Sequence, residues 1–307
     1  MMKHQDIVIE PQDGVEKVIN TLNQLARSGE YVFRGYEQQE QIYPGICRKK
    51  DGKIKDYRNI EAELLKEFEK YGSNYYKAVS PIDFMSYAQH FGLPTRLIDF
   101  TYNPFIALSF AIHNKKYSHT YSDPNDNNYY YVRYAAMKEN ICVPEIPLTD
   151  GIYNNKDSRT NSLAIRSCQC IDSVDDLFGN NRLMRRVDSL IGLTSYEQQT
   201  DVARKIENRT ILFITPNLSN QRIIMQQGLF MFPYEVDREK HLEIMKNNTS
   251  VIRIHKELRA DLLKYLDTLG FNPFRLMPDL ASICSAIKDR VTDARSDKDS
   301  NFKKAGK

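Results

Sequence analysis

Short β-prone runs that stop at Gly or Pro constrain the fold of this chain most. The run Tyr31–Arg34 ends at Gly35, and the run TILFIT at 210–215 ends at Pro216. Between such runs, apolar residues recur at the spacing of amphipathic helices. The two patterns alternate irregularly, whereas a doubly wound parallel sheet requires a regular alternation of strands and helices. The sequence therefore predicts an α+β fold, a single mixed domain with short strands and flanking helices.

Individual elements follow from these spacings and from their stop residues. Gly29 stands where the C-terminal cap of a first helix belongs, and Gly270 closes a later helix in the same way. Helices are expected at 14–28, 58–76, 81–91, 104–111, 258–269 and 278–288. Strands are expected at 31–34, 95–99, 129–136, 210–215, 229–232 and 251–254, with a short helix or turn at 222–227.

The domain organisation is expected to be simple, because no repeat or convincing linker divides the chain. A helix within residues 1–30 is expected to pack on a domain that spans 31–288. Residues 140–205 are charged with scattered apolar positions, which suits either an insertion or a helical lid. Residues 289–307 are charged and poor in apolar side chains, so they are predicted to form a disordered tail.

Composition excludes several classes of protein. The chain is 41% hydrophobic and 27% charged, with a formal charge of +3, which argues against a dedicated nucleic-acid binder. No run approaches the roughly 18 to 20 apolar residues of a membrane helix, and the N-terminus lacks the apolar segment of a secretory signal. Five scattered cysteines suit a reducing compartment. These features predict a cytoplasmic protein without membrane partners.

The sequence lacks recognised metal-binding and nucleotide-binding motifs. Cys168 and Cys170 form a C-x-C pair, but no second pair with zinc-ligand spacing accompanies it, so ordinary free thiols are expected and no metal. Neither the glycine-rich fingerprint of a Rossmann site nor that of a P-loop occurs.

Three separated blocks resemble one known family. They are YVFRG at 31–35, QHFGLPTRLIDFTYNPFIALSFA at 89–111 and RIIMQQGLFMFP at 222–233, with a weaker fourth match, FRLMPDLASI, at 274–283. In this order they are similar to the FRG-domain family, which is named for the tripeptide present here as Phe33-Arg34-Gly35. The second block keeps nearly all of the family pattern, although Phe100 stands where the family usually has Trp.

This resemblance implies a bacterial or phage protein of mobile elements, toxin-like genes or anti-phage loci. A toxin or defence effector would have a macromolecular target, here unknown, and an antitoxin or immunity partner. The layout of the blocks is also similar to that of ADP-ribosyltransferases, which place a basic residue on an early strand, Ser or Thr before a helix, and Glu or Gln on a later strand. That likeness implies an ADP-ribosyltransferase-like fold and NAD as the substrate.

The transferase layout assigns roles to particular residues. Arg34 would bind the pyrophosphate, Thr101 would lie near the nicotinamide ribose and Gln227 would contact the reacting ribose. Gln227 can bond a ribose hydroxyl but cannot act as a carboxylate base. The expected NAD-binding set is Arg34, His90, Asp99 and Tyr102.

Structural roles for the same residues stay open. Arg34 can pair with a buried acid, Asp99 can hold Arg34 or Arg96, His90 can cap a helix, and Thr101 can bond the backbone at a helix entry. The missing glutamate also favours a second function, a nucleotide- or partner-binding module of a mobile element without turnover. A nucleic-acid enzyme ranks third, because the charge is nearly balanced.

Overall fold

A computed structural model gives the structure of the chain over most of its length. It describes residues 6–50, 53–54, 57, 60–72, 74–76, 81–113, 128–144, 210–216, 221–233, 236–277, 279–280, 283–288 and 291. The expected insertion or lid at 140–205 therefore lies outside the described residues from 145 onward. The expected tail at 289–307, apart from Val291, and the pair Cys168 and Cys170 lie outside them as well.

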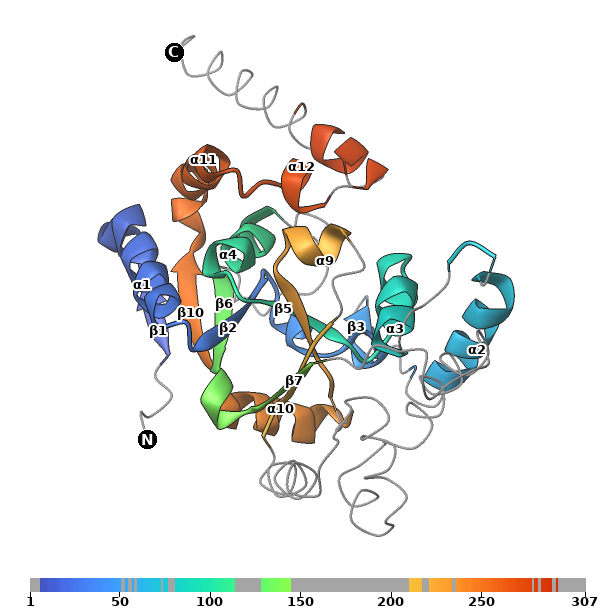
Figure 1. Cartoon of the computed structure of the whole chain (residues 1–307). Coiled ribbons are helices and arrows are strands. Elements are labelled where there is room, and N and C mark those ends of the chain that lie inside the picture. The colour runs from blue at the N-terminus through green and yellow to red at the C-terminus, as the bar shows by residue number, and fades with distance from the viewer. Residues whose placement is uncertain are drawn as a thin grey trace.

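Eight strands of the described residues form one mixed sheet in the order β1-β10-β6-β2-β5-β9-β8-β7 (Figure 1). Their bounds are β1 Ile7–Ile9, β2 Tyr31–Tyr36, β5 Ile98–Thr101, β6 Tyr129–Ala136, β7 Ile141–Pro144, β8 Leu212–Thr215, β9 Gly228–Met231 and β10 Ser250–His255. Only the outermost pairs, β1 with β10 and β7 with β8, are parallel, and the inner pairs are antiparallel. This arrangement confirms the predicted α+β class.

Helices and one small hairpin complete the described chain. The α-helices are α1 Gly14–Ser28, α2 Glu61–Gly72, α3 Pro81–His90, α4 Pro104–His113, α9 Gln221–Met225, α10 Arg238–Asn248, α11 Arg259–Leu269 and α12 Pro273–Leu276. Short 3-10 turns are η1 Pro11–Asp13, η2 Gln39–Ile42, η3 Gly45–Cys47, η6 Met137–Glu139 and η7 Lys256–Leu258, and the hairpin pairs β3 Lys49–Lys50 with β4 Lys53–Ile54. Residues 283–288 are helical, as expected. Within the described chain, no helix has the length and apolarity to cross a bilayer.

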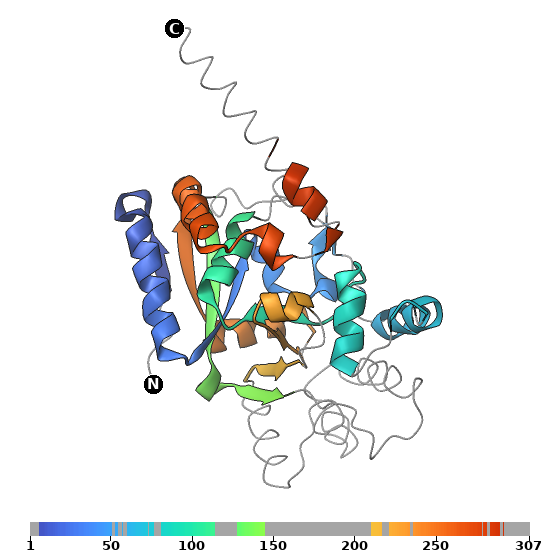
Figure 2. The same ribbon diagram turned by 45° about the horizontal axis from the view of Figure 1, so that its top comes forward.

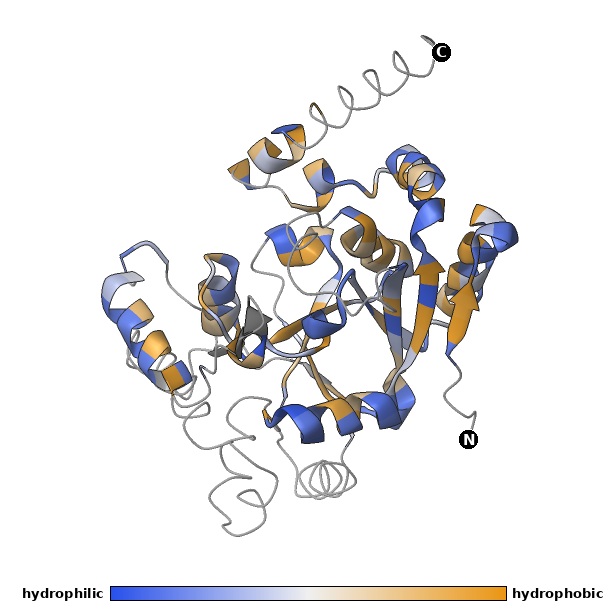
Figure 3. Ribbon diagram, turned by 180° about the vertical axis from the view of Figure 1, so that it is seen from behind, coloured by the Kyte–Doolittle hydropathy of each residue, from blue (hydrophilic) through white to orange (hydrophobic). Residues whose placement is uncertain are grey.

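The helices cover both faces of the sheet and create two apolar cores. Val32 and Phe33 are consecutive on β2, so their side chains point to opposite faces. Phe33 packs in a core with α1, α4 and α11, whereas Val32 packs in a core with α2, α3 and α10. Figure 2 shows α12 beside α4 and α9, and α12 contacts both of these helices. Apolar colour is concentrated on the strands in Figure 3, whereas α10 is mostly hydrophilic.

Gly35 is required because α4 approaches the backbone of β2 very closely. A Cβ atom at this position would lie 1.6 Å from the carbonyl oxygen of Ala107. Ala107 belongs to α4, which is buried on nearly all sides rather than along one stripe. The glycine of the Phe-Arg-Gly tripeptide is thus a packing residue that lets a buried helix contact a central strand.

Several element boundaries differ from the sequence-based expectation, and each difference has a local cause. The strand expected at 95–99 begins only at Ile98, because the Arg96 N–H donates to the Glu61 carboxylate at 2.9 Å instead of to a strand. Helix α10 escaped prediction because few apolar residues mark it, although Asp237 caps its N-terminus. The edge strands β1 and β7 are too short to show a clear alternation.

Replacing Gly35 by Ala tests the close approach. We expect Gly35→Ala to lower the free energy of unfolding by about 3 kcal/mol, because neither backbone can yield without moving α4. Gly29→Ala is the matched control. Its Cβ would meet nothing within 4 Å, and only its φ of 64° is unfavourable, so a loss of about 1 kcal/mol is expected. Urea unfolding of the three proteins measures both values, and equal losses would contradict the argument.

Candidate functional site

A cavity of about 610 Å³ lies where the four blocks of the family resemblance meet. Its walls come from β2, the η2–η3 segment, α3 and the chain after it, β5, α9 and β9, with Met277 from the fourth block. Strands β2 and β5 pair only at Phe33 and Thr101, so they separate beyond that point. Residues from both faces of β2 line the cavity, so the cavity extends into the gap between β2 and β5.

Arg34 bridges the gap between these two strands. Its Nη1 donates to the carbonyl oxygen of Asp99 at 2.5 Å, and its Nη2 donates to the carbonyl oxygen of Gln41 at 3.0 Å. The buried Nε has no partner among the described residues. Burial, followed by the positive charge of Arg48, lowers the pKa of Arg34 to about 10, while Asp99 opposes the shift. The guanidinium therefore remains charged at neutral pH on the cavity wall.

Asp99 presents an exposed carboxylate to the cavity. Gln89 Nε2 donates to its two oxygens at 3.1 and 3.2 Å, and Thr95 Oγ1 in turn donates to Gln89 Oε1 at 2.5 Å. Arg34 bonds the main chain of Asp99, not its carboxylate. This arrangement leaves a carboxylate that is held in position and can accept further hydrogen bonds from a ligand.

Arg96 is not held by Asp99, so that part of the sequence interpretation is wrong. Its guanidinium pairs with Glu61 at 2.6 Å, and both side chains are fully buried. Because the Glu61 carboxylate also accepts the Arg96 main-chain N–H, the pair fixes α2 against the chain that enters β5. Removal of one partner from such a buried pair usually costs about 3–5 kcal/mol.

Arg222 and His90 are hydrogen-bonded to each other in a second part of the cavity wall. Arg222 Nη1 donates to His90 Nδ1 at 2.6 Å, which requires the neutral ring to accept there. Burial and then the positive charge of Arg222 lower the pKa of His90, whereas Asp279 opposes the shift. His90 is therefore neutral near pH 7, with Nε2 as its remaining donor.

Three predicted site residues take positions that differ from their expected roles. Thr101 lines the cavity but is 2% exposed, and its hydroxyl donates to the carbonyl oxygen of Gln226 and accepts from the Asn103 N–H. Tyr102 and Gln227 do not line the cavity. The Tyr102 hydroxyl shares a hydrogen bond with Thr215, and Gln227 is exposed in a turn with φ 46°. Their roles in a reaction stay predictions.

Sequence reasoning missed other polar residues of the wall. Gln89 and Arg222 lie inside the second and third blocks, so the blocks themselves offered a signal for them. Gln226 lines the cavity next to Gln227 and donates to the Leu276 carbonyl at 2.8 Å. Gln41 and Arg48 come from a segment that reads as a loop, where no local pattern distinguishes a site residue.

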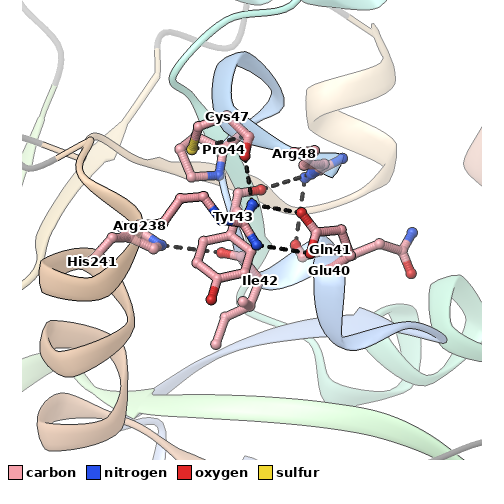
Figure 4. A network of polar contacts seen from close by, with 9 residues as sticks. All are labelled: Glu40, Gln41, Ile42, Tyr43, Pro44, Cys47, Arg48, Arg238 and His241. Atoms are coloured by element: carbon pink, nitrogen blue, oxygen red, sulfur yellow. Dashed lines mark hydrogen bonds and ion pairs between the residues drawn. The ribbon is translucent and has the colours of Figure 1, made fainter. Parts of the chain in front are cut away.

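The segment that carries Gln41 and Arg48 is fixed by a polar network to α10 (Figure 4). Arg238 donates to both carboxylate oxygens of Glu40 and to the Cys47 carbonyl, and its guanidinium lies 3.7 Å from the centre of the Tyr43 ring. His241 Nε2 lies 3.1 Å from the Ile42 carbonyl oxygen. Helix α10 therefore fixes the segment that forms this wall of the cavity.

Residues 29–120 match the family model described as the FRG domain. The chain contains an FRG domain at these residues. The match contains the first two blocks and with them Arg34, His90, Asp99 and Thr101, while the third block lies beyond it. No curated protein sequence and no solved structure matches the chain. Among the described residues, no group of three or more His, Cys, Asp or Glu side chains is placed to hold a metal ion.

The His90–Arg222 contact predicts a pH dependence of stability. The folded pKa of His90 lies below the ordinary 6.5, so the unfolded chain binds the proton first as the pH falls. The free energy of unfolding should therefore be undiminished above about pH 6.5 and decrease below it. Denaturant unfolding at about pH 7.5 and 5.5 measures the loss, which His90→Asn should reduce, because Asn can still accept from Arg222. His113, whose pKa burial also lowers, should leave a residual dependence.

Gln227 offers a separate test of the turn before β9. Its φ of 46° is unfavourable for a residue with a side chain, and the side chain is exposed. We expect Gln227→Gly to raise the free energy of unfolding by about 1 kcal/mol. The adjacent Gln226→Gly should lower it, because a buried amide loses its bond to Leu276. A loss of stability in Gln227→Gly would contradict the assigned turn.

Proposed function

We propose that this FRG-domain protein binds a nucleotide in the cavity, with NAD as the first ligand to test. One observation carries the proposal: blocks more than a hundred residues apart in sequence converge on one cavity whose wall carries guanidinium groups beside an exposed carboxylate. The cavity volume lies within the range of roughly 300–1,000 Å³ that is usual for small-molecule sites.

Charge and hydrogen-bonding capacity support a phosphorylated ligand. Arg34 and Arg48 both direct Nη atoms to the Gln41 carbonyl, at 3.0 and 3.4 Å, so two guanidinium groups lie side by side. Their mutual repulsion contributes to the lowered pKa of Arg34, and a phosphate between them would relieve it. Asp99, positioned by Gln89, is suited to accept from the hydroxyl groups of a ribose.

Binding is tested by calorimetric titration of NAD and ADP into the wild-type chain and Arg48→Gln. We expect Arg48→Gln to weaken both affinities by roughly 10- to 100-fold, because charge-assisted hydrogen bonds contribute about 1.5–3 kcal/mol. Arg27→Gln is the matched control, since it removes an exposed arginine of α1 that does not line the cavity. Absence of binding by folded wild-type protein, or an equal effect of both variants, would refute the proposal.

The second candidate function is ADP-ribosyl transfer, and the exposed Asp99 carboxylate is the observation that favours it. In this reaction the bond between ribose C1′ and the nicotinamide nitrogen breaks, and nicotinamide leaves with the electron pair. A bond then forms from C1′ to a nucleophile of the target, whose proton passes to Asp99 or to water. Asp99 would also stabilise positive charge that develops on the ribose. Thr101, with its hydroxyl committed to the main chain, would support the site rather than react.

Nicotinamide release separates the two functions. The wild-type chain is incubated with NAD, with and without cell lysate, beside Asp99→Asn. Release by the wild type that is lost in Asp99→Asn, although NAD still binds, indicates transfer, and label on a macromolecule then reveals the target class. NAD binding without release in any lysate indicates a binding module without turnover.

The biological role that accompanies either function rests on the FRG resemblance. We propose a toxin-like or anti-phage effector of a bacterial mobile element, or else a sensing module of such an element. An antitoxin or immunity partner would be expected for a toxin. Growth arrest upon expression in a bacterial host, abolished by Arg48→Gln but not by Arg27→Gln, would connect this role to the cavity.

A further inference from the structure

Phe110 is a phenylalanine of the buried helix α4 that keeps part of its surface accessible. Its chain neighbours Ser109 and Ala111 are buried, whereas Phe110 is only partly buried and lines the cavity. The hydrophobic clusters of the described residues do not include it, although Phe105 of the same helix packs in one of them. Phe110 therefore offers an apolar surface to a molecule in the cavity.

The opening between β2 and β5 places Asp99 across from Gly35. Phe33 pairs with Thr101, and continuation of this antiparallel register would bring Gly35 opposite Asp99. Paired residues of antiparallel strands direct their side chains to the same face, and side chains alternate along each strand. The Asp99 side chain therefore points to the same face of the sheet as Phe33, which is the face that α4 covers.

Helix α4 brings Phe110 to the same opening. A Cβ atom at Gly35 would lie 1.6 Å from the Ala107 carbonyl oxygen and 3.0 Å from the Ala111 nitrogen, so this side of α4 lies directly on β2. Residues 107, 110 and 111 share one side of the helix, because positions three and four apart are neighbours on a helix surface. Phe110 and Asp99, which both line the cavity, therefore border its part on the α4 face of the sheet.

The other phenylalanine and tyrosine residues of the cavity wall offer less surface to a ligand. Phe33, Phe100 and Phe230 are 1%, 3% and 4% exposed, because they pack in the two cores. Tyr57 is partly exposed, but it packs against the buried side chains of η3. Phe110 combines partial exposure with a position outside these clusters, so it is the better surface for a planar group.

Asp99 connects this apolar surface to the cationic part of the cavity. Its main-chain carbonyl accepts from Arg34, and Arg48 lies beside Arg34. Because Arg34 follows Phe33 on β2, its side chain starts from the opposite face of the sheet, away from α4. A ligand that contacts both the guanidinium pair and Phe110 therefore passes Asp99. Phosphate, ribose and base follow one another in this order in a nucleotide.

We propose that Phe110 is the surface on which the base of the bound nucleotide packs, so that the nucleotide extends through the opening between β2 and β5 with its phosphates at Arg34 and Arg48. This inference rests on the proposed nucleotide binding and specifies a ligand with an aromatic base. A ribose phosphate without a base would not use the part of the cavity beside Phe110. Contact with a ring face accepts any of the bases, since each has a π-face.

The test compares ligands with and without a base. ADP, ribose 5-phosphate and inorganic pyrophosphate are titrated calorimetrically into the wild type, Phe110→Ala and Phe110→Tyr. We expect Phe110→Ala to weaken ADP binding about tenfold, as loss of a stacking partner does, and to leave the affinities for the other two ligands unchanged. Phe110→Tyr keeps the ring and should retain the affinity for ADP.

Two further variants separate the side chain from the helix that carries it. Phe105→Ala is the matched control, because Phe105 is a partly exposed phenylalanine of α4 that does not line the cavity, and it should leave ADP affinity unchanged. Phe110→Leu keeps an apolar side chain in α4 but has no planar face. It should also weaken ADP binding selectively, and it takes the place of Phe110→Ala if that variant does not fold.

The outcomes separate the inference from the function on which it rests. If the folded wild type binds none of the three ligands or NAD, nucleotide binding fails and the inference fails with it. If ADP binds and the loss of the ring leaves its affinity unchanged, or weakens pyrophosphate binding equally, only the role of Phe110 is refuted. Loss of ADP affinity in Tyr57→Leu with none in Phe110→Ala would place the base on Tyr57 and overturn the proposed path through the opening.

Discussion

The Arg34 guanidinium stands where β2 and β5 cease to share backbone hydrogen bonds. Beyond the single register pair of Phe33 and Thr101, Arg34 joins β2 to β5 by donating to the Asp99 carbonyl oxygen, and it joins β2 to η2 by donating to the Gln41 carbonyl oxygen. The Arg34 side chain thereby replaces backbone hydrogen bonds between the strands. The sheet can open here without leaving these carbonyl groups unpaired. The cavity lies at this opening, and Arg34, Asp99 and Gln41 all line it. The adjacent Gly35 lets α4 pack against the opened strand.

Two further interactions keep the walls of this opening fixed. The buried pair of Glu61 and Arg96 attaches α2 to the chain before β5, and Arg238 attaches the η2–η3 segment to α10. Both involve charged groups whose removal from water is costly, so each is effective only because nearly every donor finds an acceptor. A site whose walls are fixed by such interactions is suited to bind a ligand with little rearrangement.

The chemistry of the wall supports binding more directly than turnover. Guanidinium groups, a neutral histidine and amides make most of its polar surface, and Asp99 supplies the carboxylate that a transfer reaction would use. Gln227, which the transferase layout would place at the ribose, is exposed in a turn outside the cavity lining. The two proposed functions thus differ in the role of a single side chain, Asp99, which either binds the ribose or also takes part in the transfer reaction.

The sequence by itself determined the α+β class, helix α1 with its Gly29 cap, the buried α4 and strand β6 with its bounds, because periodicity and stop residues are local properties. It also indicated Arg34, His90 and Asp99, which the structure brings to one cavity. Only the tertiary structure decided that Arg96 pairs with Glu61, 35 residues away, and that Arg48 joins the site. It also decided that Gln226 faces the cavity while Gln227 does not, because the left-handed turn at Gln227 separates the directions of two adjacent side chains. Such choices depend on contacts between distant segments, which local patterns do not record.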